Sequence, residues 1–221
     1  MRAADMGSSR EMIEPVDGTS FSRVGAFLAA FVGVGGLVYG ILFALILKGT
    51  STNVLRAWLV LAILGGLAVT GVFVALFERL RLTDPPLAMW ALLLGVAAGL
   101  GQMLNASVAL GYQIYVTPPP GTFEGTPDPV GILRFGLNGV ALFLFGSVMV
   151  RARDFPRALG LLADAGGLLL VVMYVGRLAG FINPATKVTL IPPFLYGFVI
   201  HPVFYVWMAR HLLRPQAEGA A

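Results

Sequence analysis

Six apolar segments dominate this chain, and each has about the length that a helix needs to cross a lipid bilayer. A hydrocarbon core about 30 Å thick is crossed by roughly 20 apolar residues in an α-helix. The sequence therefore predicts an all-α integral membrane protein, a bundle of six transmembrane helices. We expect these helices at about residues 24–47, 57–77, 86–115, 132–150, 159–181 and 193–212.

Composition excludes most soluble classes of protein. The 221 residues are 57% hydrophobic and only 12% charged, against about 45–50% apolar and about 25% charged in an ordinary soluble domain. The balance excludes a soluble enzyme domain, a nucleic-acid-binding module and a secreted disulfide scaffold. The chain has no cysteine and two histidines, which argues against thiolate zinc sites, iron–sulfur clusters and covalently attached haem. We therefore expect no metal site and no nucleic-acid partner.

The distribution of basic residues predicts the topology. The transmembrane domain is expected to cover residues 24–214, between a polar N-terminal tail (1–23) and a short C-terminal tail (215–221). Of the 15 Lys and Arg residues, ten lie in the tails and loops of one side and four on the other. The positive-inside rule then places both termini in the cytoplasm of a cell with a bacterial-type plasma membrane. The proline-rich connection 116–131 would lie outside, either as a functional loop or as a simple connector.

Small residues are expected to hold the bundle together. Lipid provides little hydrophobic drive between helices, so close packing depends on residues that let two backbones approach. Pairs of glycines four residues apart and adjacent glycines occur in several segments. We interpret them as contacts within one chain: Gly36 and Gly40, Gly95 and Gly99, Gly176 and Gly180, Gly65 and Gly66, and Gly166 and Gly167.

Polar side chains at membrane depth are the candidate functional residues, because placing such groups in lipid is costly. Their positions along the predicted helices allow Gln102, Asn105, Asn138, Arg177 and His201 to meet in the central-to-outer half of the bundle. They would form a polar pocket with one fixed positive charge and one imidazole. Such a site suits a quinone, a porphyrin-type pigment or a lipid headgroup.

Pro202 draws attention to the segment around His201. A proline within a helix removes a backbone donor and kinks the helix, here freeing the carbonyl of Phe198. Freed backbone at membrane depth is tolerated where it is packed in protein or lines a cavity. Tyr196, Tyr205 and Trp207 flank this position.

Each candidate also has a structural explanation. Arg134 and Arg177 can extend to the outer headgroups, and Asp164 can pair with Arg157 on the same helical face. Gln102 and Asn105 can simply bridge helices by hydrogen bonds. A buried histidine such as His201 is often only a hydrogen-bonded packing residue.

Three segments resemble a group of small bacterial membrane proteins. They are the sequence RDFPRALGLL at Arg153–Leu162, GVGGLVY at Gly33–Tyr39, and the ending from Trp207 to Leu212, Leu213 and Arg214. Together they are similar to an uncharacterised family of six-helix integral membrane proteins, a domain of unknown function. The resemblance covers about residues 24–214 and implies the same helical fold. That family has no established activity, so it implies no substrate and no catalytic residue.

The sequence favours a non-catalytic membrane protein, either a subunit of a larger membrane complex or a binding module for a lipid-like, quinone-like or pigment-like ligand. Its partners would be the lipid bilayer and other membrane subunits or a second copy. Two alternatives stay open. One is a small transporter or channel that uses the region of Asn138, Arg177 and His201. The other is an enzyme acting on a lipid, with His201 or Asp164 as base.

Overall fold

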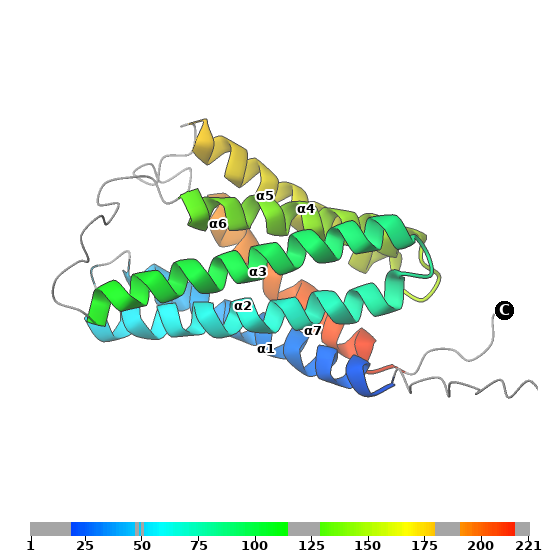
Figure 1. The fold of residues 1–221 in the computed structure, drawn as a ribbon, viewed down its shortest axis with the longest axis horizontal. Coiled ribbons are helices and arrows are strands. Elements are labelled where there is room, and N and C mark those ends of the chain that lie inside the picture. The colour runs from blue at the N-terminus through cyan, green and yellow to red at the C-terminus, as the bar shows by residue number, and fades with distance from the viewer. Residues whose placement is uncertain (1–18, 47–48, 50, 115–128, 180–190, 215–221) are drawn as a thin grey trace, which may run out of the picture.

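The structure, a computed structural model, describes residues 19–46, 49, 51–114, 129–179 and 191–214. These residues are helical almost throughout and contain no strand (Figure 1). The helices are α1 (Thr19–Ile46), α2 (Thr52–Leu80), α3 (Pro85–Ile114), α4 (Pro129–Arg151), α5 (Arg157–Leu178), α6 (Ile191–Leu195) and α7 (His201–Leu212), with a π-helical segment, η2 (Tyr196–Ile200), between the last two. Because α6, η2 and α7 follow one another without a break, we call Ile191–Leu212 the sixth helix.

Six helices are long and apolar enough to cross a membrane, which confirms the predicted all-helical architecture. The second helix extends beyond the predicted apolar run at both ends, because helical hydrogen bonding continues through Arg56 and as far as Leu80. The third helix begins at Pro85, after Asp84, whose Oδ1 accepts a hydrogen bond from the Leu87 N–H at 3.2 Å. An aspartate in this position satisfies one of the free N–H groups of the first turn.

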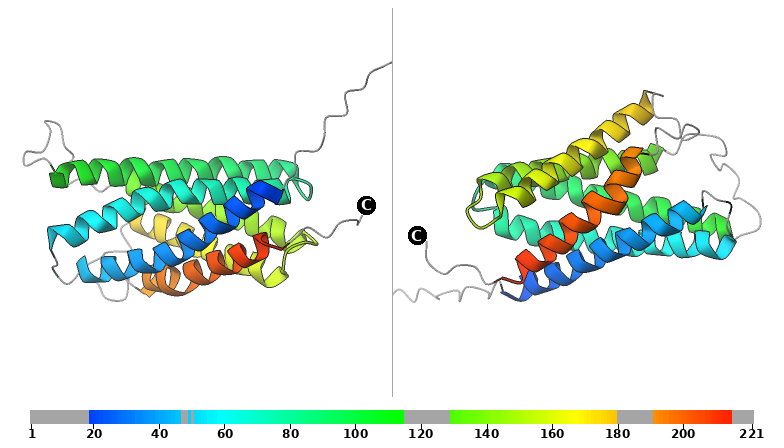
Figure 2. Two further views of the ribbon diagram at one scale, coloured as in Figure 1. Left: turned by 90° about the horizontal axis from the view of Figure 1, so that it is seen from below. Right: turned by 180° about the vertical axis from the view of Figure 1, so that it is seen from behind.

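Neighbours in sequence are also neighbours in space. Each of α1 to α4 packs against the next helix along the chain, and α7 returns to pack beside α1 (Figure 2). Contacts between α5 and the sixth helix are sparse. The bundle is therefore a ring whose thinnest seam lies between α5 and the sixth helix.

The predicted glycines do serve close packing within the chain. Gly66 of α2 and Gly99 of α3 meet backbone to backbone, since a Cβ added to Gly66 would lie 2.8 Å from the Gly99 carbonyl oxygen. Gly36 and Gly40 of α1 face His201 and Phe198 of the sixth helix. Gly180 of the predicted pair Gly176 and Gly180 lies outside the described residues. The intramolecular interpretation is confirmed for Gly36, Gly40, Gly66, Gly95, Gly99, Gly166 and Gly167.

Four glycines bring α4 and α5 together, and of these only Gly167 was singled out from the sequence. Gly139 and Gly146 of α4 oppose Gly167 and Gly160 of α5, and the two glycines on each helix are seven positions apart. A Cβ added to Gly167 would lie 2.5 Å from the Gly139 carbonyl oxygen and 2.6 Å from the backbone nitrogen of Phe143. This is the helix packing by small residues that membranes favour.

The ends of the described chain lie at one end of the bundle (Figure 1). There, Arg79 of α2 donates to Ser22 Oγ of α1 at 3.2 Å and to the carbonyls of Leu212 and Arg214 at 3.2 and 3.3 Å. A cation that binds the last carbonyls of a helix satisfies groups with no helical partner and complements the helix dipole. Arg79 thus joins the beginning of α1 to the end of α7.

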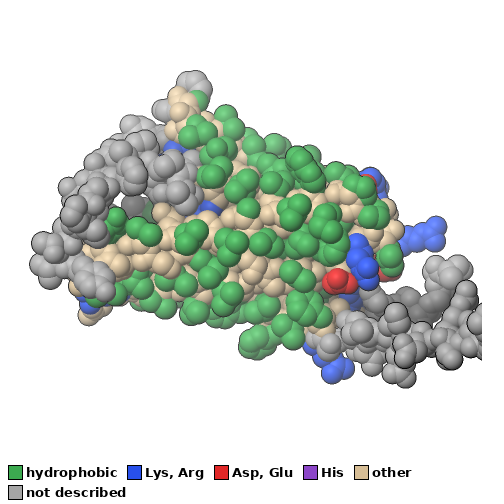
Figure 3. Space-filling view, viewed as in Figure 1, with side chains coloured by type: hydrophobic (Ala, Val, Ile, Leu, Met, Phe, Trp, Pro, Cys, Tyr) green, Lys and Arg blue, Asp and Glu red, His purple; other side chains and the backbone are tan. Residues whose placement is uncertain are grey.

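The surface of the bundle is apolar along its length. On the face that Figure 3 shows, hydrophobic side chains cover the helices, and charged side chains gather near the end that carries Arg79. Exposed large side chains such as Phe27, Leu67 and Leu104 are 76%, 58% and 65% exposed. An exposed apolar surface of this extent suits contact with lipid rather than with water.

Candidate functional site

The sixth helix is irregular immediately before His201 and Pro202. Residues Tyr196–Ile200 form one wider π-helical turn, in which the His201 N–H donates to the carbonyl of Tyr196, five residues back. The irregularity expected at Pro202 is therefore present, and it takes the form of a π-turn on the N-terminal side of the proline. Such turns are frequent at functional sites because they reposition the side chains that follow.

A cavity of about 420 Å³ lies beside this turn. It is lined by one stretch from each of the six helices. This stretch lies at the middle of α3 and toward the end remote from Arg79 on the other helices. Its volume falls within the range of about 300–1,000 Å³ that is typical of small-molecule sites. The cavity therefore occupies one half of the bundle.

The opposite half is closed by packed side chains. Leu76 and Leu80 of α2, Phe145 and Met149 of α4 and Met208 of α7 are all fully buried there. Phe73 of α2 stacks on Phe145 with ring centroids 5.6 Å apart. The described residues thus enclose a space that ends within the bundle.

Four of the five predicted site residues line this cavity: Gln102, Asn138, Arg177 and His201. Asn105, one turn beyond Gln102, does not line it. Gln102 also bridges helices, because its Nε2 donates to the Ala62 carbonyl at 2.9 Å. The ligand-site and helix-bridging interpretations therefore both apply to Gln102.

The two arginines at this end of the bundle differ in their surroundings. Arg177, in the last turn of α5, is exposed while lining the cavity. Arg134 was expected to extend to the headgroups, but it is only 9% exposed and lines the cavity. The Cβ of Arg134 lies on the side of Gly101 of α3, and its guanidinium lies close to the Tyr39 hydroxyl of α1. The burial of Arg134 therefore favours a place in the cavity wall over extension to the headgroups.

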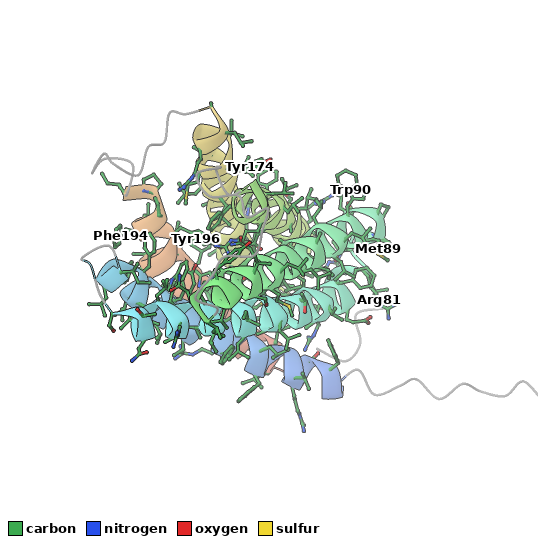
Figure 4. The ribbon with its side chains drawn as sticks, turned by 60° about the vertical axis from the view of Figure 1, so that its left-hand side comes forward. Arg81, Met89, Trp90, Tyr174, Phe194 and Tyr196 are labelled. Carbon is green, nitrogen blue, oxygen red and sulfur yellow. The ribbon has the colours of Figure 1, made fainter. Side chains whose placement is uncertain are left out.

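Aromatic side chains form much of the wall. The His201 ring lies between Tyr196 and Tyr205, with ring centroids 5.6 and 4.6 Å away, and packs directly against Gly36. Figure 4 shows Tyr196 and Phe194 on the sixth helix, Tyr196 reaching toward the helices opposite. Because Gly36 has no side chain, the imidazole can approach the backbone of α1.

Sequence reasoning missed a second aromatic group on α1 and α2. Tyr39 stacks on Trp58 with ring centroids 4.7 Å apart, and Phe43 stacks on the same indole at 6.2 Å. All three residues line the cavity. The signal available in the sequence was the spacing of Tyr39 and Phe43, four residues apart and hence on one helical face. By contrast, Trp207, which sequence reasoning placed at the kink, does not line the cavity.

The cavity collects buried polar atoms that have no hydrogen-bond partner. Seven such side-chain atoms occur among the described residues, and six of them belong to cavity residues. The Tyr196 hydroxyl lies beside Asn138, but the contact does not reach hydrogen-bond geometry, so both groups remain unpaired. The six atoms are Trp58 Nε1, Arg134 Nε, Asn138 Oδ1, Tyr196 Oη, His201 Nδ1 and Tyr205 Oη.

Asp164 lies outside the cavity, in the closed half of the bundle. It was expected to pair with Arg157, but its carboxylate instead accepts a hydrogen bond from Ser147 Oγ of α4 at 3.4 Å. Neither ion pair among the described residues involves Asp164. The close approach of α4 and α5 at Gly146 and Gly160 brings Ser147 and Asp164 together. Among the described residues, no group of three or more His, Cys, Asp or Glu side chains could hold a metal ion.

Comparison with known proteins gives no match: no protein-family model, no curated protein and no solved structure is similar to this chain. The resemblance to a six-helix bacterial family therefore stays a prediction.

Proposed function

We propose that this protein is a non-catalytic membrane module that binds a small amphipathic ligand, of the lipid, quinone or pigment type, in the cavity between its six helices. We further propose that it resides in a bacterial-type plasma membrane with both termini in the cytoplasm. There it would act as a subunit of a larger complex or as a homo-oligomer.

One observation carries this proposal: six of the seven unpaired buried polar atoms in the described residues surround one cavity. Buried polar groups in native proteins almost always have partners, and each exception calls for an explanation. An unpaired group costs about 1–3 kcal/mol. Scattered exceptions would have separate causes, whereas six around one space have a common explanation in a molecule that fills it.

The rest of the wall supports an amphipathic ligand rather than a polar solute. Phe31, Phe43 and Phe198 line the cavity together with Leu61 and Val69. Sites for small organic molecules typically combine a mainly apolar lining with a few placed polar groups. Water alone would satisfy the polar atoms but would leave the apolar wall hydrated.

The two alternatives have less support. A transporter needs a polar route to both ends of the bundle, and the half near Arg79 is filled by buried apolar side chains. A lipid-acting enzyme needs a nucleophile or an activated water close to its base. His201 contacts tyrosines and glycine, and Asp164 contacts Ser147 away from the cavity.

Native mass spectrometry of the protein in lipid nanodiscs, together with an absorption spectrum, tests the proposal. We expect a stoichiometric small molecule that is enriched over the surrounding lipid. Gly35→Leu should expel it, because Gly35 lines the cavity and a Cβ there meets only the Leu61 side chain, at 3.6 Å. Gly111→Leu is the matched control, since a Cβ at Gly111 has nothing within 4 Å and the residue is not part of the wall.

A second variant addresses the histidine directly. His201→Ala should release the bound molecule while the protein remains folded in the membrane. If wild-type protein carries no enriched molecule, or if Gly35→Leu and His201→Ala retain it as Gly111→Leu does, the proposed function is wrong. A co-purifying protein partner would in addition support the role as a complex subunit.

A further inference from the structure

The cavity carries positive charge without a matching negative charge. Arg134 and Arg177 both line it, and no Asp or Glu is part of its wall. The two ion pairs among the described residues join Arg81 to Glu78 and Arg151 to Asp84, away from the cavity. The described part of the chain thus leaves both cavity arginines without a carboxylate.

Arg134 makes this imbalance costly. Its side chain is only 9% exposed, and its Nε atom has no hydrogen-bond partner among the described residues. Its guanidinium lies 4.9 Å from the centroid of the Phe135 ring and close to the Tyr39 hydroxyl. A ring face and a phenol offset part of the desolvation of a cation, but buried charges in proteins are normally paired with an opposite charge.

Among the unpaired polar atoms of the cavity, hydrogen-bond donors also outnumber acceptors. Trp58 Nε1 and Arg134 Nε can only donate hydrogen bonds, and the hydroxyls of Tyr196 and Tyr205 can donate as well as accept. Asn138 Oδ1 is the one unpaired cavity atom that can only accept. A molecule that satisfies this set must present at least two acceptor atoms, one each for Trp58 Nε1 and Arg134 Nε.

The rest of the cavity wall indicates the apolar part of the ligand. Apolar and aromatic side chains make up most of the remaining wall. Met173 and Arg177 of α5 and Pro193, Phe194 and Gly197 of the sixth helix belong to this wall where the two helices have few contacts. A hydrocarbon chain in this position can continue from the cavity into the bilayer between α5 and the sixth helix.

We propose that the ligand is an anionic amphiphile, a hydrocarbon chain with a carboxylate or phosphate head, and that Arg134 binds this head with Arg177 at the mouth of the cavity. The inference rests on the proposed function and narrows its ligand class. An oxyanion supplies the missing negative charge and several acceptors at once. Arg is well suited to it, because the guanidinium can donate two parallel hydrogen bonds to a carboxylate or phosphate.

Quenching of Trp58 fluorescence provides the test. The chain has three tryptophans, so Trp90→Phe combined with Trp207→Phe leaves Trp58, in the cavity wall, as the only reporter. The probes are a dibrominated C18 fatty acid, the alcohol with the same chain, the phosphate monoester of that alcohol, and a decyl-substituted benzoquinone. Comparison of the acid with the monoester distinguishes a carboxylate head from a phosphate head.

We expect an anionic probe to bind about 10- to 100-fold more tightly than the alcohol, as for a hydrogen-bonded ion pair that is removed from water. Arg134→Gln should abolish this preference, and Arg134→Lys should retain part of it. Arg56→Gln is the matched control, because Arg56 lies on α2 near the same end of the bundle, is exposed and donates to the Gln113 carbonyl at 2.7 Å. If Arg134→Gln does not fold, Arg177→Gln should lower the preference instead.

Two outcomes would overturn the inference at different levels. In the first, the alcohol or the quinone binds as tightly as the anions, and Arg134→Gln and Arg56→Gln show the same preference among the probes. The proposal of an anionic head is then wrong, while the proposal of ligand binding stands. If no probe quenches Trp58 more in wild-type protein than in the cavity-filling variant Gly35→Leu, the cavity does not take amphiphiles, and the proposed function fails as well.

Discussion

Replacing Gly167 by alanine should force α4 and α5 apart. The added Cβ would lie 2.5 Å from the Gly139 carbonyl oxygen, whereas ordinary contacts begin at 3.4 Å, so the two backbones must separate by about 0.9 Å. Both nearest atoms, the other being the Phe143 nitrogen, belong to the backbone, and no change of rotamer can relieve the contact. Overpacking of this kind costs typically about 1–3 kcal/mol, and we expect about 2–3 kcal/mol here.

Gly111→Ala is the control that isolates this cost. Glycine to alanine within a helix gains about 1 kcal/mol from helix propensity at either site, and at Gly111 the Cβ has nothing within 4 Å. The free energies of unfolding of the two variants should therefore differ by about 2–3 kcal/mol, which is about 30- to 150-fold in the unfolding equilibrium. Equilibrium unfolding in mixed micelles with increasing dodecyl sulfate, followed by circular dichroism, measures the difference. Equal midpoints for the two variants would refute the argument that close backbone approach holds this seam.

Three further predictions concern other parts of the molecule. Gly36→Ala should weaken ligand binding at least tenfold without unfolding the bundle, because its Cβ would occupy the position of the histidine ring it faces; unchanged affinity in the fluorescence titration would show that the ring position does not matter. Arg79→Gln should destabilise the protein by about 1–2 kcal/mol and speed hydrogen exchange at the end of α7, because hydrogen bonds to the last carbonyls are lost; Arg81→Gln, whose partner is an exposed i,i+3 glutamate, should change little. A cysteine at Gly121 should react with an impermeant reagent on intact cells and one at Ala217 only after lysis, since the chain has no other cysteine; the reverse pattern would invert the proposed topology.

Hydropathy was sufficient to predict the helices, because the length of an apolar run reflects bilayer thickness rather than any partner. The expected positions along the helices also agree with the structure in one respect, because Gln102, Asn138 and His201 line one cavity. Which side of each helix faces the bundle and which faces lipid was harder to predict. In a helix that faces lipid, both the packed side and the lipid side are apolar, so the periodicity that reveals the buried side of a soluble helix is weak.

Arg134 and Asn105 illustrate this limit. Arg134 lies near the end of its helix, as expected, and its side chain is buried in the bundle, with its guanidinium close to the Tyr39 hydroxyl. Asn105 is three residues beyond Gln102, about 4.5 Å further along the helix, which is enough to leave the cavity. Neither outcome can be derived without knowing which helices are neighbours, and that order depends on glycine contacts such as Gly139 with Gly167.

The pairing of the last helix with the first has a consequence for biosynthesis. The helices α1 to α5 each meet a partner that the ribosome has just made or makes next, so their contacts are local in sequence. The nearest neighbours of Gly33, Gly36 and Gly40 on α1 all belong to the sixth helix, more than 150 positions later. Until that helix is made, these three positions lack those neighbours, and the cavity lacks one of its walls. Binding of the proposed ligand must therefore follow synthesis of the sixth helix, and a chain truncated before Ile191 should insert into the membrane yet remain exposed to quality-control proteolysis.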